Sequence, residues 1–502
     1  MAKAILAIDQ GTTRTTVMVI DASGRILSRA YGEVRQFYPR PGWVEHDAEQ
    51  IYRSVIRLAR EAIAAAGVAD SELAGVGITN QRETFVVWDR ANARPVHRAI
   101  VWQCRRSAGI CERLREREDE IQSRTGVLAD PYFSGTKLKW LLDSDRNLRR
   151  RAVKGELCFG TIETWLIFKL SRGKVFASDY TNASRTMMLN LERLEWDPIM
   201  LEMLGVPAAM LPALVSSHGT IAEAVRGTIC NRALPIVAAI GDQQSALFGQ
   251  GCTKAGDAKV TYGTGAFLLT HTGDRRMASR NRLVATSAVD AGGAPSYALE
   301  GSVFIAGAAV QWIRDELGLI GTSAESVTLA RKSRDRTHPF VVPAFAGLGA
   351  PYWDSEARGA IFGLSRGTTR ADLVRATLDS IAYQVADVLA AMEKDTGGSI
   401  PELRVDGGAA ANDYLMQFQA DLLGRPVRRP AMLETTALGA ALLAGFATGL
   451  WRSPEQIRGR IGGKAKIFRP TMRQAERDCL LALWHDAVAR TLTGRNSAKS
   501  TS

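Results

Sequence analysis

The chain has 502 residues, 46% of them hydrophobic and 23% charged, which is ordinary for a globular protein but too long a chain for one hydrophobic core. The net charge of +12 is compatible with nucleic-acid binding, but the densest basic run, residues 146–154, has no aromatic side chains, so we expect small anionic substrates and no nucleic acid. The six cysteines and six histidines show no disulfide or metal-ligand spacing, and no signal peptide precedes the first strand-like stretch, so a cytoplasmic protein is expected.

The first predicted element is a pair of short apolar strands at residues 4–21, AILAIDQGTTRTTVMVID, joined by a polar turn. The first strand ends on Asp9, and Thr12 and Thr13 stand in the turn. Closely spaced backbone N–H groups and hydroxyls in such a turn can bind a phosphate, and an aspartate beside them can anchor Mg²⁺. Taken alone, the motif is also compatible with an ordinary hairpin whose turn is polar.

The stretch DAEQIYRSVIRLAREAIAAAG predicts a helix, with Asp47 as its N-cap and Gly67 at its C-terminus. A strand follows at residues 75–79, GVGIT, and further strands are expected at residues 84–88 and 99–102. Strands that alternate with helices indicate an α/β fold.

Arg82 and Glu83 stand side by side after the GVGIT strand. Such a pair could hold a polyol from both sides, because arginine donates hydrogen bonds and glutamate accepts them. The alternative is a solvent-exposed turn, the usual place of adjacent charged residues. Trp102 and Tyr132 could form an aromatic wall of the same pocket, or belong to the core.

The stretch LPIVAAIGDQQSALFGQG predicts a buried strand that breaks at Gly241, followed by a helix. Asp242 projects from the end of this strand, where a carboxylate can take the proton of an acceptor hydroxyl during phosphoryl transfer. Aspartate is also a favoured N-cap, so the pattern by itself supports both roles.

A second hairpin is predicted at residues 257–273, DAKVTYGTGAFLLTHTG, and it repeats the first one: apolar strand, Gly-Thr turn, apolar strand. The hairpins begin near residues 4 and 258, half a chain apart, which indicates two structurally related halves. The glycine-rich segment FGQGCTKAGD precedes the second hairpin, so we place the domain boundary there, with domains at residues 1–250 and 251–502.

A third turn lies in LRVDGGAAANDYLMQF, where a strand meets a diglycine and a helix begins near Asn412. Such a turn makes a flat floor for a nucleotide, although a loop without a ligand is the alternative. Helices are also expected near residues 370–392 and 412–423. The apolar run at residues 435–451 is too short and too rich in Ala and Gly for a membrane span, so we expect a core helix and no membrane insertion.

Several segments in this order resemble the glycerol kinases, which belong to the carbohydrate kinases of the actin-like ATPase superfamily: PGWVEHD, GITNQRET, AIVWQCRR, DPYFSGTK, DYTNASRT, GDQQSALFGQ, YGTGAF, PAFAGLGAPYWD, GAIFGL and RVDGGAAAN. The resemblance implies two ribonuclease-H-like domains related by internal duplication, with the active site in the cleft between them. It implies the transfer of phosphate from ATP, with Mg²⁺, to glycerol, giving sn-glycerol 3-phosphate in the first step of glycerol catabolism. It also implies a homo-oligomer, a dimer or a tetramer. The alternatives are a kinase of erythritol or xylulose, or a nucleotide-regulated binding protein.

Carried over position by position, the resemblance makes Asp242 the general base and Asp9 the carboxylate near Mg²⁺. The residues that match polyol contacts are Arg82, Glu83, Trp102, Tyr132, Asp242, Gln243 and Phe267. The residues that match nucleotide contacts are Thr12, Thr13, Thr264, Gly307, Gln311, Gly408 and Asn412.

The chain departs from the family at three places. The first turn reads DQGTTRTT, with Arg14 where a serine is usual and Thr16 where an arginine is usual, so we expect Arg14 to reach the nucleotide and to alter its KM modestly. The stretch RGTICNRALPI lacks the Gly-Gly-Thr-Arg loop that binds fructose 1,6-bisphosphate in some members, and IGGKAKIFRP lacks the acidic residue that engages a phosphocarrier. The resemblance therefore does not extend to these two regulatory features.

Overall fold

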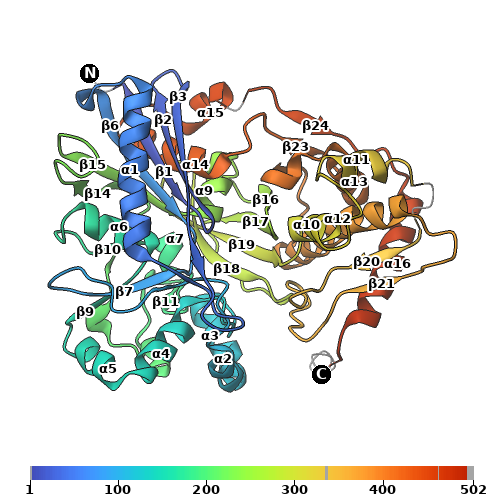
Figure 1. The fold of residues 1–502 in the computed structure, drawn as a ribbon, viewed down its shortest axis with the longest axis horizontal. Coiled ribbons are helices and arrows are strands. Elements are labelled where there is room, and N and C mark those ends of the chain that lie inside the picture. Colours follow the sequence, from blue (N-terminus) through green and yellow to red (C-terminus); the bar gives the residue numbers. More distant parts are fainter. Residues whose placement is uncertain (1–2, 334–336, 462, 495–502) are drawn as a thin grey trace.

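A computed structural model describes residues 3–333, 337–461 and 463–494 of the chain; Gly462, within the IGGKAKIFRP stretch, lies outside them. Two large mixed sheets form the frame. The strands of one come from the first half of the chain and the strands of the other from the second half, and Figure 1 shows them in blue to green and in yellow-green to orange-red.

The first sheet has the strand order β14-β15-β6-β1-β2-β3. Strands β3, β2 and β1 are antiparallel to one another, and β6 and β15 then continue parallel to β1. Their bounds are β1 Ala4–Gln10, β2 Arg14–Asp21, β3 Ile26–Glu33, β6 Leu73–Asn80, β14 His218–Ala224 and β15 Leu234–Gly241.

The second sheet has the order β18-β19-β17-β16-β22-β23-β24. Strands β19, β17 and β16 are antiparallel, and β22 and β23 then continue parallel to β16, so the central five strands repeat the pattern of the first sheet. Both predicted hairpins and the internal duplication are confirmed. The bounds are β16 Ala258–Tyr262, β17 Ala266–Gly273, β18 Val284–Val289, β19 Pro295–Val303, β22 Leu403–Asp406, β23 Val427–Arg429 and β24 Lys466–Phe468.

Helices α9 (Asp242–Gly249) and α14 (Thr435–Ala447) lie against each other between the sheets (Figure 1). Each packs on the sheet of the other half: α14 contacts β1 and β6, and α9 contacts β16 and β17. Their approach requires glycine, because a Cβ on Gly439 would lie 1.9 Å from the Ser245 carbonyl oxygen and one on Gly249 would lie 2.2 Å from that of Thr435. The core helix expected in this Ala/Gly-rich run is confirmed, and no helix within the described ranges is long and apolar enough to cross a membrane.

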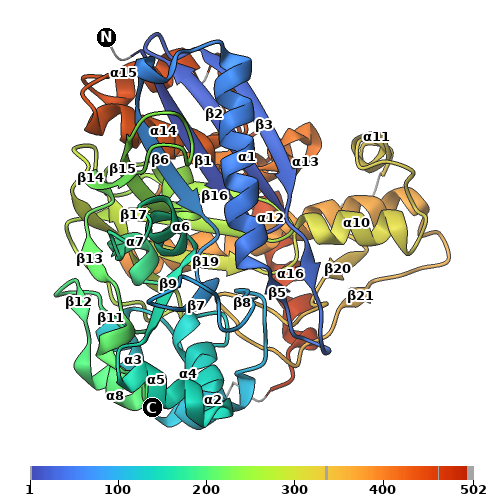
Figure 2. The same cartoon turned by 60° about the vertical axis from the view of Figure 1, so that its left-hand side comes forward.

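Helix α1 (Ala48–Ala66) crosses the outer face of β1–β3, as Figure 2 shows. Its predicted caps are confirmed: the Asp47 carboxylate accepts from the backbone N–H groups of Glu49 and Gln50 at 2.9 and 3.0 Å, and Gly67 ends the helix with φ +65°. Helices α12 (Arg370–Thr396) and α13 (Asp413–Leu423) also lie where the sequence places them.

A five-stranded sheet, β4-β5-β8-β7-β9, is inserted into the first half. Its strand β8 (Ala99–Ile100) is shorter than predicted, because the chain turns after it, with the Cys104 N–H donating to the Val101 carbonyl oxygen at 2.9 Å. The other strands of this sheet are β4 Gln36–Phe37, β5 Glu45–His46, β7 Phe85–Asp89 and β9 Leu157–Thr161.

Further two-stranded sheets and helices complete the two halves. Three two-stranded sheets pair β10 Ala177–Asp179 with β13 Ala213–Val215, β11 Leu189–Asn190 with β12 Glu195–Trp196, and β20 Phe340–Val342 with β21 Ala360–Phe362. The remaining α-helices are α2 Ala108–Leu114, α3 Glu118–Thr125, α4 Ser134–Ser144, α5 Arg146–Val153, α6 Ile162–Leu170, α7 Tyr180–Ala183, α8 Pro198–Leu204, α10 Gly307–Asp315, α11 Glu325–Ala330, α15 Pro454–Ile461 and α16 Gln474–Thr491.

Candidate active site

Asp242 is the first residue of α9, directly after the buried strand β15. Gly241, not Asp242, occupies the N-cap position, so the N-cap alternative for this aspartate is wrong. One carboxylate oxygen accepts from the N–H of Gln243 at 2.7 Å and lies 3.2 Å from Nε of Arg82. Burial raises the pKa of Asp242, against the opposing charges of Arg82 and Lys259.

Arg82 and Glu83 are buried, at 2% and 1% exposure, so the alternative of a solvent-exposed turn is wrong. Both belong to an ion-pair cluster with Arg185 and Glu300. Arg82 donates to the two Glu300 oxygens at 2.5 and 2.9 Å, and Nε of Arg185 donates to Glu83 at 2.6 Å. Glu83 has a backbone φ of +58°, an uncommon left-handed conformation that tends to mark functional sites.

The cluster joins the two halves of the chain, because Glu300 lies on β19 while its partners belong to the first half. Although burial raises it, the charges of Arg185 and Arg82 lower the pKa of Glu300 to about 2. Glu300 is therefore ionised, and it fixes the Arg82 guanidinium beside Asp242.

Three aromatic side chains meet beside this cluster. The ring of Trp102 makes edge contacts with Tyr132 and with Phe267 of the second half, at centroid distances of 5.5 and 6.1 Å. Nε1 of Trp102 donates to Oγ1 of Thr12 at 2.9 Å, which connects the aromatic wall to the first hairpin turn. The structure therefore brings the residues predicted to bind a polyol together with the predicted phosphate turn.

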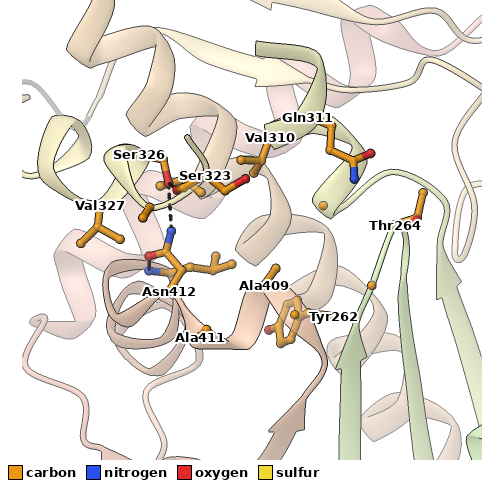
Figure 3. A pocket seen from close by; sticks show the side chains of 16 residues that line it. Tyr262, Thr264, Val310, Gln311, Ser323, Ser326, Val327, Ala409, Ala411 and Asn412 are labelled. Atoms are coloured by element: carbon orange, nitrogen blue, oxygen red, sulfur yellow. Dashed lines mark hydrogen bonds between the residues drawn. The ribbon is translucent and has the colours of Figure 1, made fainter. Parts of the chain in front are cut away.

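A cavity of about 440 Å³ lies in the second half, between the β16–β17 turn, α10 and the diglycine turn (Figure 3). All five second-half residues that the sequence assigns to the nucleotide line it, namely Thr264, Gly307, Gln311, Gly408 and Asn412. Asn412 caps α13 and donates to Oγ of Ser326 at 3.2 Å. The lining residues Ser323, Ser326 and Tyr262 were not predicted, because small polar and core residues carry no distinctive pattern.

Asp9 lies near the end of β1, opposite Thr16 on β2. Burial and then the charge of Asp242 raise the pKa of Asp9 to about 7, so its negative charge is poorly compensated by the protein. Within the described ranges, no group of three His, Cys, Asp or Glu side chains is arranged to hold a metal ion. Mg²⁺ fits this setting, since it commonly uses one or two carboxylates together with substrate phosphates.

The other predicted residues of the first turn are accessible. Thr12 is half-buried, and Thr13 and Arg14 are exposed. The guanidinium of Arg14 lies over the ring of Tyr31, 4.8 Å from its centroid, and its charge lowers the pKa of Asp9 against the stronger effects of burial and Asp242. Arg14 thus stands beside the turn and stacks on β3.

Lys259, Arg185 and Glu300 are functional candidates that the sequence did not single out. Lys259 and Glu300 each interrupt an apolar strand, AKVTY and PSYALEGSV, and a charged residue in such a strand is the signal that could have found them. The Nζ of Lys259 donates to Oε1 of Gln243 at 2.5 Å, so the predicted polyol residue Gln243 is held from the second half.

Comparisons with known proteins cover both halves. Models of the FGGY family of carbohydrate kinases match the chain, the N-terminal domain over residues 4–249 and the C-terminal domain over residues 258–448. The glycerol kinase of Fusobacterium nucleatum is 52% identical over 492 residues, covering 97% of this chain and 99% of that protein. Glycerol kinase 2 of Thermotoga maritima is 51% identical over 495 residues, covering 98% and 99%.

Among solved structures, Plasmodium falciparum glycerol kinase with ADP superposes with a TM-score of 0.90 at 34% identity, covering 97% of this chain and 98% of that one. A ligand-bound xylulose kinase from Lactobacillus acidophilus reaches a TM-score of 0.88 at 21% identity, over 97% and 98% of the two chains, which shows the shared fold alone. The chain is an enzyme of the FGGY family of carbohydrate kinases, and within that family it belongs with the glycerol kinases.

Proposed function

We propose that this enzyme transfers the γ-phosphoryl group of ATP to glycerol, giving sn-glycerol 3-phosphate and ADP, in the cytoplasm and as the first step of glycerol catabolism. The observation that carries the proposal is the buried Arg82–Glu83 pair, whose Arg82 lies 3.2 Å from Asp242 and donates to the hydroxyl of Tyr132 in the aromatic wall at 3.4 Å. A donor, an acceptor and an apolar wall are what a small polyol requires. The relatives named glycerol kinase support this substrate over other polyols.

In the proposed reaction, the Asp242 carboxylate accepts the proton of a terminal hydroxyl of glycerol. The hydroxyl oxygen forms a bond to the γ-phosphorus, and the bond from that phosphorus to the bridging oxygen of ADP breaks. Arg82 and Gln243 orient the polyol, and the raised pKa of Asp242 makes it a better proton acceptor at neutral pH. Catalysis then rests mainly on positioning, because phosphoryl transfer needs little covalent help from the protein.

We further propose that the cavity in the second half holds ATP, with Thr264 and the first-turn residues Thr12 and Thr13 at its phosphates. Asp9 would anchor Mg²⁺, which neutralises phosphate charge during the transfer. The matched ranges 4–249 and 258–448 support our division of the chain at residue 250. We expect a homo-oligomer, a dimer or a tetramer; light scattering of the purified protein tests this expectation.

ADP release with Mg-ATP, measured alone and with glycerol, erythritol or xylulose, tests the proposal. We expect release that depends on glycerol and is lost in Asp242→Asn, while Asp274→Asn, an exposed aspartate in the turn after β17, serves as the matched control with normal turnover. Release with erythritol or xylulose only would move the substrate and keep the mechanism. Release that depends on no acceptor would favour a nucleotide-regulated binding protein.

A further inference from the structure

Lys259 is the second residue of strand β16 and is buried, with 0% of its surface exposed. Its Nζ donates to Oε1 of Gln243 at 2.5 Å and to Oγ1 of Thr261 at 2.8 Å. The neighbouring Val260 points to the opposite face of the sheet, into the core of the second half. An apolar residue would satisfy the packing of this strand at lower desolvation cost, so the ammonium calls for a reason other than stability.

The charges that face Lys259 come from four other elements or turns. Asp406 ends β22, Asp242 begins α9, Arg82 follows β6, and Glu300 lies on β19; each of them influences the Lys259 ammonium electrostatically. Lys259 thus stands where helix α9, the β16–β17 hairpin and strand β22, which leads into the diglycine turn, come together.

The bond to Gln243 fixes the orientation of a carboxamide. An ammonium group only donates hydrogen bonds, so Oε1 of Gln243 must face Lys259 and its Nε2 remains to donate elsewhere. A polyol hydroxyl oxygen is an acceptor for such a donor. Without Lys259 the carboxamide could rotate and present either group.

We propose that Lys259 is a positioning residue of the phosphoryl-transfer site. Lys259 orients Gln243 toward the polyol and places a positive charge between α9 and the β16–β17 hairpin. This inference rests on the proposed glycerol kinase activity. Burial lowers the pKa of Lys259 to about 8, so its charge is present at neutral pH and is lost in mildly alkaline solution. Burial and the charge of Glu300 raise the pKa of Asp242, and the charges of Lys259 and Arg82 lower it. Asp9 is a further carboxylate that interacts with Asp242.

The test measures kcat and KM for glycerol across pH in the wild type and in Lys259→Met. We expect KM to rise about tenfold, the effect of losing one charge-assisted hydrogen bond. The alkaline limb of kcat/KM near pH 8, which reports the loss of the Lys259 charge, should disappear in Lys259→Met. The acid limb, which reports the protonation of Asp242, should move up by about one pH unit, because a nearby cation typically lowers the pKa of a carboxyl by this much or more.

Two further variants separate orientation from charge. Lys259→Gln can still donate to Gln243 but is neutral, so it should keep KM within about twofold and lose the alkaline limb; it also serves as the test if Lys259→Met does not fold. In a Gln243→Ala background, Lys259→Met should raise KM less than about twofold further, because residues that act through one another are not additive.

Lys137→Met is the matched control. Lys137 is also buried, and burial also lowers its pKa to about 8, but it donates to the Tyr132 carbonyl oxygen at 2.8 Å rather than to Gln243. The control should keep the alkaline limb. Equal pH profiles in the two methionine variants, or additive effects with Gln243→Ala, would overturn the inference while the proposed function stands. A wild type without glycerol-dependent turnover would overturn both.

Discussion

The two hairpins that face the active site occupy the same place in the two sheets, yet their turns are built differently. In the β1–β2 turn one glycine, Gly11, precedes two threonines. In the β16–β17 turn, Gly263 and Gly265 flank a threonine, and a Cβ on Gly265 would lie 2.5 Å from the Val303 carbonyl oxygen. The end of β19 thus presses against the second turn, and glycine is required there by backbone approach.

The hairpins also differ in charge. When the turns are aligned, Gln10 with Tyr262, Asp9 has Thr261 as its counterpart and Lys259 has Ala7. Ala7 packs with α14 in an apolar cluster, whereas Lys259 is bonded to α9. The duplicated backbone therefore carries an aspartate near the end of β1 in one hairpin and a buried lysine in β16 in the other.

The largest expected effect comes from removing the proposed base, Asp242. Asp242→Asn keeps the shape of the side chain but cannot accept the proton, so kcat should fall by about 10²–10⁴-fold. Affinity for ADP, measured by calorimetry, should remain nearly unchanged, because the cavity in the second half is untouched. Unchanged turnover would remove Asp242 from its role.

The close approach of the β19 backbone to Gly265 is tested by Gly265→Ala. The added methyl group meets the Val303 and Phe304 carbonyl oxygens at 2.5 and 3.0 Å, so the free energy of unfolding should fall by about 1–3 kcal/mol. Gly263→Ala is the control, since its Cβ would meet its nearest neighbour at 3.7 Å, and its melting temperature should stay close to that of the wild type. Equal loss in both variants would contradict the argument from backbone approach.

The difference in charge between the two hairpins is tested by Asp9→Asn, which removes the carboxylate of the first one. Because the pKa of Asp9 is raised to about 7 in the folded protein, the folded state binds more protons than the unfolded state between about pH 4 and 7, and stability falls as pH rises through this window. Without metal, the variant should therefore be more stable than the wild type by about 1–2 kcal/mol at pH 8, with a smaller gain at pH 5.5. It should also lose Mg²⁺-dependent activity.

Asp21, at the far end of β2, gives the opposite sign. Although burial raises it, hydrogen bonds from Ser23 and Arg25 hold the pKa of Asp21 below its usual value. Asp21→Asn should therefore destabilise the protein at neutral pH, and thermal melts of both variants across pH measure the difference. A stabilised Asp21→Asn would show that the effect is not specific to Asp9.

The smallest effect is expected from Arg14→Ser. Arg14 is exposed and stacks on Tyr31 beside the first turn, so its removal should change the KM for ATP by about two- to threefold, and added salt should reduce the difference. Arg25→Ser, at the other end of β2, is the control with unchanged KM. Identical KM values in all three proteins would show that Arg14 does not reach the nucleotide.

The sequence predicts the elements whose causes are local. The caps of α1, the strand before Asp242 and the two Gly-Thr hairpins follow from patterns within a few residues. Glu300 was missed because its partners Arg82 and Arg185 lie 218 and 115 residues away, and no local pattern reports such a pairing. The resemblance to a known family supplied the roles of single residues, which spacing alone left open.

The exchange of α9 and α14 between the sheets makes the first half depend on the second for the burial of its sheet. One face of the first sheet, with Ile5, Ala7, Met18 and Ile20, is covered by the helix that follows the last parallel strand of the other half. A single half made alone would expose that apolar face to water. The first half therefore needs the helix of the second half to bury this face, and the two halves are expected to unfold together rather than as separate units.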